Sequence, residues 1–423
     1  MSRLAHQAET LKLARLLDVD PAQLSMLAKT TPEAIRALRE QATHAAFADD
    51  EAFFKRVVAA SRLLPVPVLA LVAEHALGPL LAARVAGQMD VKRGVGIARR
   101  LPAEFLTEVC LHLDPQRSRA LIRAIDVDLI VEVAIHLAER DEHVTMGRFV
   151  DIITDEAIAA VVASLEDDAD LLHTAFLAEN KARLDAIVEH LPEDRILSVI
   201  RTAASADDLW PETLGLMQHL SPEVRGRLAD LAASQDATIL TSMVRSVQAH
   251  DLWGDVLPLL ADMNETSRAR FANLPAVQAP EMLSDVLRAA SRDQVWGDLL
   301  PLVRLMEEDG RARCAAVASR LDGEQLLQVA HAAADHQCWP ELIDLIRRMP
   351  SDIRIDMIAL LGLAPPAVIE SLVPALEAAD AWALLTPAWG RMSQGARTRL
   401  QSAADAQGLG ERISALVAPS AGR

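Results

Sequence analysis

The chain has 423 residues, 51% of them hydrophobic, and a formal net charge of −18, which provides enough apolar material for a folded core and excludes a disordered chain. The acidic balance argues against general nucleic-acid binding, because an acidic surface repels phosphate backbones. It favours solubility and basic partners. Three scattered cysteines, Cys110, Cys314 and Cys338, are too few for a disulfide framework and indicate buried, reduced thiols.

The composition also favours helices and a cytoplasmic location. Aromatic residues make up only 3% of the chain and tyrosine is absent, so most of the apolar content is aliphatic and rich in the helix formers Ala and Leu. The amino-terminal residues show no basic segment followed by an apolar core, so we expect no signal peptide. The most apolar run, residues 63–73, contains two prolines and is too short to cross a bilayer as a helix.

Residues 1–90 carry start signals for several short helices. Asp20-Pro21 and Thr31-Pro32 each place a capping side chain before a proline at the first helical position. Another helix is expected to begin at Asp50-Glu51. No copy of the repeat described below is evident in this part, so we expect a divergent cap or a separate helical region.

Residues 63–88 allow two interpretations. They form either a pair of buried helices, since an apolar run of this length is usually core, or an exposed apolar hairpin that touches a membrane surface or a partner. The basic segment Lys92–Arg100 follows. Its two glycines lack the third glycine and the preceding strand of a phosphate-binding loop, so we expect a solvated linker there.

Between residues 91 and 209, short helices are expected to follow one another with single capping residues between them. Examples of this punctuation are Leu113-Asp-Pro, Ile153-Thr-Asp-Glu and Leu191-Pro-Glu-Asp. The pattern resembles the superhelical intracellular N-terminal domain of MgtE-type magnesium transporters and, more loosely, armadillo and HEAT repeats. The resemblance covers roughly residues 100–206 and implies the helical shape alone. The transmembrane helices of the transporters have no counterpart here, so no magnesium function is carried over.

A repeat is evident in the second half of the chain. Tryptophans occur at 210, 253, 296, 339 and 382, each 43 residues after the last, and the segments that begin at Trp253 and Trp296 are nearly identical. Apolar residues recur three, four, seven and ten positions after the Trp in most copies, which is the spacing of one helix face. We therefore expect the Trp to be a core residue at the seam between repeats, with a ligand-stacking ladder as the alternative. Position ten holds Leu220, Met263, Met306, Met349 and Met392, and such a row typically fills gaps in a core.

These patterns predict an all-α protein, and more specifically a right-handed α-solenoid of the armadillo/HEAT kind with a helical N-terminal region. Its 43-residue repeats would mostly contain three helices. We divide the chain into an N-terminal cap at 1–90, degenerate helical repeats at 91–209, and five repeats at 210–423. The five repeats begin near residues 210, 253, 296, 339 and 382.

Polar residues recur as regularly as the core. An acid stands two residues after most of the tryptophans, and arginines stand fifteen and seventeen residues after them. Two arginines spaced in this way point to different sides of a helix. One of each pair is expected to bond an acid or a helix C-terminus, while the alternative is an arginine ladder that binds an acidic or extended partner. The candidate partner-binding residues are Arg225, Arg227, Arg268, Arg270, Arg311, Arg313, Arg354, Arg397 and Arg399.

No motif for catalysis or metal binding stands out. The chain lacks a nucleophile elbow, a Walker loop and a His-Glu-x-x-His motif, and the spacing of His331, His336 and Cys338 matches no zinc pattern. We therefore expect no enzyme, cofactor or metal. The function predicted first is a scaffold or adaptor that binds a protein partner along a solenoid groove. The alternative is a peripheral membrane or apolar-surface adaptor that uses residues 63–88, and a weaker third class is an enzyme with a site between the N-terminal part and the repeats.

Overall fold

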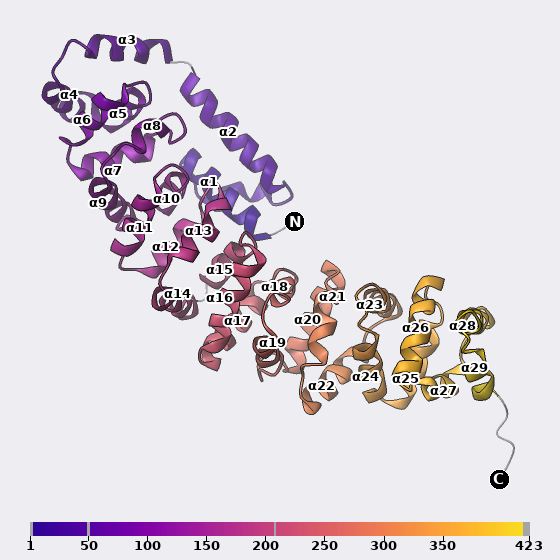
Figure 1. Ribbon diagram of the computed structural model, residues 1–423. Helices are drawn as coiled ribbons and strands as arrows, with labels where there is room; N and C mark the ends of the chain where they lie inside the picture. The colour runs from indigo at the N-terminus through magenta and orange to yellow at the C-terminus, as the bar shows by residue number, and fades with distance from the viewer. Residues whose placement is uncertain (1–2, 49–50, 207–208, 418–423) are drawn as a thin grey trace. The chain divides into compact units, whose positions relative to one another are not determined.

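The computed structural model describes residues 3–48, 51–206 and 209–417 (Figure 1). Within these ranges the chain forms helices joined by short turns and contains no strand, which confirms the all-α fold class. The helices gather into two compact units, Met1–Val224 and Arg225–Arg423. The abundance of Ala and Leu explains the helical bias, because both residues lose little conformational freedom in a helix.

The first unit opens with α1 (Arg3–Leu17) and α2 (Pro32–Ala48), which lie against each other. Asp20 and Thr31 each accept a backbone N–H of the turn that follows, at 2.8 and 3.3 Å, so both expected start signals are present. The other helices of this unit are α3 (Glu51–Ser61), α4 (Val66–Val72), α5 (Gly78–Ala86), α6 (Val91–Ala98), α7 (Ala103–His112), α8 (Arg119–Ile122), α9 (Val127–Ala138), α10 (His143–Phe149), α11 (Asp155–Ser164), α12 (Asp168–Phe176), α13 (Leu184–His190), α14 (Glu193–Ser205) and α15 (Leu209–Met217).

The expected linker at Lys92–Arg100 is wrong, because Val91–Ala98 forms α6. Asp90 caps this helix by accepting the backbone N–H of Arg93. Gly94 is buried where α6 meets α8, and a Cβ there would lie 2.6 Å from Leu121 Cδ1. The glycine therefore permits close packing of two helices and does not loosen the chain.

The helices of the second unit pack mainly on the helix two places further along the chain, as α18 does on α20 and α20 on α22. The helix α16 (Pro222–Ser234) crosses the boundary between the units. The others are α17 (Ala237–Ala249), α18 (Trp253–Leu260), α19 (Glu265–Ala272), α20 (Pro280–Asp293), α21 (Trp296–Val303), α22 (Glu308–Ala318), α23 (Gly323–Asp335), α24 (Trp339–Arg348), α25 (Ser351–Leu361), α26 (Pro366–Ala378), α27 (Leu385–Trp389), α28 (Gln394–Ala406) and α29 (Gly410–Val417).

The tryptophans of the repeat are core residues, as the spacing predicted. All five are buried, with exposed fractions of 1–5%, and the residues at position ten are buried beside them. The helices α18, α21 and α24 begin at the Trp itself. The indole N–H of Trp339 donates to Ser371 Oγ at 3.0 Å, so the ring is both packed and oriented. A ligand-stacking ladder is excluded, because the rings do not face solvent.

Four residues in the second unit adopt the left-handed backbone conformation at intervals of 43 residues. Asp251, Gln294, Gln337 and Asp380 have φ between 46° and 58°, and each stands two residues before a Trp. The next backbone N–H bonds back to the carbonyl five residues earlier, at 2.8–3.1 Å, which closes the end of the preceding helix. This turn fixes the entry of the chain into the helix that the Trp begins.

Candidate functional site

The segment 63–88 is neither wholly buried nor wholly exposed. It forms α4, a π-helical turn at Ala73–Leu77 and α5. At the junction Gly78 has φ 73°, a conformation that favours glycine, and Pro79 follows. Leu69 and Val85 are buried on one face, while the opposite face carries exposed leucines.

The exposed face of α4 and α5, together with neighbouring residues of the chain, forms a surface that we call the apolar patch. Leu63 is 88% exposed and Leu71 is 58% exposed, values unusual for large aliphatic side chains in a folded unit. In the part of the second unit that the structure describes, Leu363 is the only large hydrophobic residue with comparable exposure. The apolar patch consists of Phe53, Leu63, Leu64, Val68, Leu71, Leu80 and Leu81.

The same stretch is also apolar over the length of a membrane helix. Val66–Ala86 spans 21 residues with a mean hydropathy of 1.7, and 22% of the tested window is buried. By itself this is weak evidence for a membrane span, since core helices of soluble proteins also meet the criterion. The helix is interrupted by the π-helical turn and by Gly78, so its geometry is that of a bent, surface-lying element.

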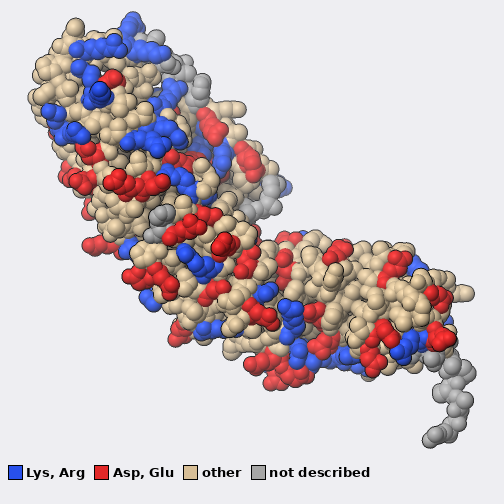
Figure 2. Space-filling model, in the orientation of Figure 1, with Lys and Arg blue, Asp and Glu red and all other residues tan. Residues whose placement is uncertain are grey.

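Basic side chains surround the apolar patch. Residues 51–100 contain eight Lys and Arg and only three Asp and Glu, whereas the whole chain has a net charge of −18. Figure 2 shows Lys and Arg gathered at the end of the first unit that carries α3. Six of these eight are exposed, and we call four of them, Lys55, Arg56, Arg62 and Lys92, the basic rim. The combination gives this end of the unit a local charge opposite to that of the chain.

The arginines seventeen residues after the tryptophans are held by elements of the preceding repeat. Arg270 donates to two carbonyls at the end of α16, and Arg399 donates to the carbonyl of Gly362 after α25 at 3.1 Å. Arg313 donates to the side chain of Gln278. A cation at a helix C-terminus satisfies carbonyls that have no partner within the helix.

The arginines fifteen residues after the tryptophans are half-buried. Arg225 pairs with Asp262 at 2.5 Å, and Arg311 pairs with Glu308 at 3.1 Å. Arg354 and Arg397 each donate, at 3.1 Å, to a carbonyl near the end of the helix before their own. The contacts found at these positions are therefore intramolecular. Partner binding through the nine candidate arginines, with Arg227 and Arg268 completing the set, stays a prediction.

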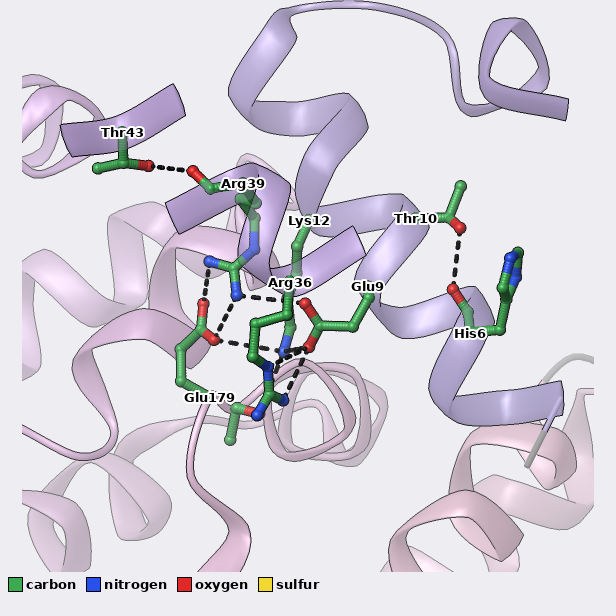
Figure 3. Close-up of polar contacts among 9 residues, drawn as sticks. His6, Glu9, Thr10, Lys12, Arg36, Arg39, Thr43 and Glu179 are labelled. Carbon is green, nitrogen blue, oxygen red and sulfur yellow. Dashed lines mark hydrogen bonds and ion pairs between the residues drawn. The ribbon is translucent and has the colours of Figure 1, made fainter. Parts of the chain in front are cut away.

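A cluster of buried charges, which the sequence did not reveal, ties α1 and α2 to the loop after α12 (Figure 3). The Glu9 carboxylate accepts from Lys12 at 3.1 Å and from Arg36 at 2.9 Å, and Arg39 bridges Glu9 to Glu179 with contacts of 3.2 and 2.7 Å. Lys12 and Glu9 are both buried. The cations around Glu9 hold its pKa below the usual range against the opposing effect of burial. The cluster fixes the amino-terminal hairpin in place.

A second polar group joins α10, α12 and α15. His173 Nδ1 lies 2.6 Å from Glu212 Oε2, which is the acid two residues after Trp210. This hydrogen bond raises the pKa of His173. His143 lies 2.8 Å from Asp170, and the two imidazole rings are 4.9 Å apart. Paired imidazoles and acids can exchange protons, but no hydroxyl or thiol nucleophile is placed with them among the contacts of the described residues.

A polar pocket of about 460 Å³ in the first unit lies between α8, the start of α11 and the segment after α12. Its lining includes Arg119, Arg123 and Asp151. Burial raises the pKa of Asp151. The nearby guanidinium of Arg183 is occupied by the carbonyls of Val150 and Ile153, at 2.8 and 3.0 Å. The pocket therefore mixes acids and fixed cations without a convergent catalytic set.

The thiols offer little chemistry. Burial raises the pKa of both Cys110 and Cys314 to about 12, so both stay protonated at neutral pH. Across residues 3–48, 51–206 and 209–417, no group of three or more His, Cys, Asp or Glu side chains could hold a metal ion. No protein-family model matches the chain, and no curated protein is similar to it in sequence.

Proposed function

We propose that the chain is a non-enzymatic adaptor, a right-handed α-solenoid of 43-residue repeats whose N-terminal end docks on an anionic membrane surface from the cytoplasmic side. The exposure of the apolar patch carries this proposal. A soluble unit rarely exposes so many neighbouring large aliphatic side chains unless they meet a partner or a membrane. Transfer of a leucine from water contributes about 2 kcal/mol when it is fully buried.

The basic rim favours an anionic membrane over an uncharged partner as the surface that the apolar patch contacts. Each Lys or Arg near an anionic leaflet contributes about 1 kcal/mol, and the attraction falls off within a Debye length. Exposed leucines on α4 and α5 beside exposed cations on α3 and α6 have the composition of an interfacial element. The bend at Gly78 favours an element that lies in the interface over one that spans the bilayer.

Vesicle co-sedimentation tests the docking. The chain is expected to bind vesicles of phosphatidylcholine and phosphatidylserine, to bind phosphatidylcholine vesicles weakly, and to dissociate as salt rises. The double variant Leu63→Glu/Leu71→Glu should abolish binding, because it places two anions on the apolar patch. The matched control is Leu363→Glu, which changes a leucine that is 47% exposed and lies outside the patch. Equal binding by the double variant and the control would rule out the patch as the docking surface.

The 43-residue periodicity of the sequence supports a second candidate function, the binding of a protein partner along the second unit. The supporting observation is the position of Arg227, Arg270 and Arg313, which are spaced by 43 residues in the second unit and stay exposed. Arg270 and Arg313 do so while they also donate hydrogen bonds within the unit. Regularly spaced cations on stacked helices suit an acidic, extended partner.

Crosslinking in native lysate, followed by mass spectrometry, tests this second function. A partner captured by the parent chain should be lost from Arg227→Glu/Arg313→Glu. It should be retained by Arg288→Glu, because Arg288 is an exposed arginine of the same unit outside the row. If all three chains crosslink to the same set of proteins, the arginines do not bind the partner.

A further inference from the structure

The first unit contains an apolar cavity, partly open to solvent, that neither proposed function uses. It has a volume of about 480 Å³ and runs along the unit from α3 to α12. Its lining is almost entirely aliphatic, with Leu69, Val109 and Ile130 among its members. The volume lies within the range of about 300–1,000 Å³ that is typical of small-molecule sites.

The few polar groups in the lining are already occupied. Ser61 Oγ donates to the carbonyl of Val58 at 2.7 Å, and Thr174 Oγ1 donates to Met146 Sδ at 3.6 Å. Cys110 stays protonated, since burial raises its pKa to about 12. A water molecule needs two to four hydrogen-bond partners, which this lining does not offer. The cavity therefore suits an apolar occupant, and an empty void would forfeit many dispersion contacts.

The mouth of the cavity lies at the end of α3. Ala60 and Leu64 line the cavity and are also exposed, so the cavity reaches the surface beside them. The guanidinium of Arg93 is held at this rim, where it donates to the carbonyls of Ser61 and Leu64 at 3.0 and 2.8 Å. Leu64 also belongs to the apolar patch. A fixed positive charge beside an apolar mouth matches a ligand with an anionic head and an apolar tail.

We propose that the cavity binds one alkyl chain of an anionic amphiphile, with its carboxylate or phosphate head group at Arg93. The aliphatic lining extends through α9 and α11, so an alkyl chain would contact apolar side chains of several helices. The proposal goes beyond membrane docking and does not depend on it, because a free fatty acid reaches the mouth from solution.

Titration of the delipidated full chain with cis-parinaric acid, a fluorescent fatty acid, tests the cavity. Saturable binding is expected, with one equivalent of ligand. Ala134→Phe places a ring in the cavity and should weaken binding at least tenfold, whereas Val131→Phe lies on the same helix outside the lining and should leave binding unchanged. Absence of saturable binding, or equal binding by the two variants, would overturn the proposal.

Thiol labelling provides a readout that does not depend on how well Ala134→Phe folds. Cys110 lines the cavity, while the buried Cys314 belongs to the second unit. Oleate should slow the reaction of Cys110 with a small alkylthiosulfonate and leave the reaction of Cys314 unchanged. Equal rates at Cys110 with and without oleate would contradict occupation of the cavity.

Two further arms identify the head group and the source of the ligand. Arg93→Met should remove the preference for oleate over oleyl alcohol, and an unchanged preference would overturn the role of Arg93. Incubation with phosphatidylserine vesicles, followed by native mass spectrometry of the re-isolated protein, separates the sources. If a phospholipid is retained, the bound alkyl chain belongs to a membrane lipid. If the protein binds oleate but retains no phospholipid, the natural ligand is a free fatty acid. Neither mass present would refute the site.

Discussion

The two ends of the chain build helices in the same way and use apolar side chains differently. In the described part of the second unit the tryptophans of the repeat and the residues ten positions later are buried, and Leu363 is the one large hydrophobic side chain that is exposed. In α3–α5 the apolar content is as high, but one face lines a cavity and the other meets solvent. Hydrophobic content alone therefore does not distinguish a packing surface from a binding surface. The two kinds of surface are distinguished by which apolar side chains are exposed and which charges lie near them.

The largest difference between the ends should appear in stability. Trp296→Ala should destabilise the second unit by about 3–5 kcal/mol, because it removes a buried ring and leaves a cavity. Leu63→Ala should change stability by less than about 0.5 kcal/mol, because its side chain is already in water. Urea unfolding of both variants measures this. A cost for Leu63→Ala that approaches that of Trp296→Ala would mean that the apolar patch is part of a core.

The buried charge cluster should be the next most sensitive feature. Lys12→Met should cost about 3 kcal/mol, since it leaves Glu9 buried with one cation fewer. Arg15→Met on the same helix removes a more exposed pair with Glu142 and should cost less than about 1 kcal/mol. Thermal unfolding of the two variants gives the comparison. Similar costs would show that the cluster does not anchor the amino-terminal hairpin.

The arginine contacts at helix ends should differ between the units. Arg399→Ala removes a charged hydrogen bond to the carbonyl of Gly362 and should cost about 1–2 kcal/mol. Arg195→Ala removes a charged hydrogen bond to the carbonyl of Leu165 and also the 2.9 Å ion pair with the buried Asp168, so it should cost more, about 3 kcal/mol. Chemical unfolding of both variants, with Arg288→Ala as an exposed control, measures the loss. Equal costs would show that the pair with Asp168 adds nothing to the helix-end contact.

The smallest expected effect is a dependence of stability on pH. Glu212 raises the pKa of His173 above its ordinary value of 6.5. The resulting stabilisation is complete below pH 6.5 and is lost as the pH rises through the raised folded pKa. His173→Gln should flatten the pH profile of the unfolding free energy by less than about 1 kcal/mol. His75→Gln is the control. If the pH profile of His173→Gln is unchanged, the pair of His173 and Glu212 does not contribute to stability.

Local signals in the sequence predicted the helix starts well. The Trp spacing predicted that the tryptophans are core residues, and Asp20 and Thr31 predicted caps, because each signal acts within a few helical turns. The prediction of a linker at Lys92–Arg100 was wrong, because the helix there is stabilised by the packing of Gly94 on Leu121, which lies in a later helix of the chain.

Features that depend on contacts between distant residues could not be predicted from the sequence. Glu9 meets Glu179 through Arg39, across well over a hundred residues of chain, and no local pattern encodes that contact. The exposure of residues 63–88 depends on which of their two faces finds neighbours, so both interpretations had been open. The left-handed residues at Gln294 and Gln337 also gave no signal, because glycine is the residue expected in that conformation.

Hydrogen exchange with and without phosphatidylserine vesicles compares both ends of the chain in one experiment. If the apolar patch docks on the membrane, exchange becomes slower in α3–α5 when vesicles are added and stays unchanged in α21–α24. Leu63→Glu/Leu71→Glu should show no vesicle-dependent protection at either end. Unchanged exchange in α3–α5 of the parent chain, or protection confined to the second unit, would contradict docking through the apolar patch.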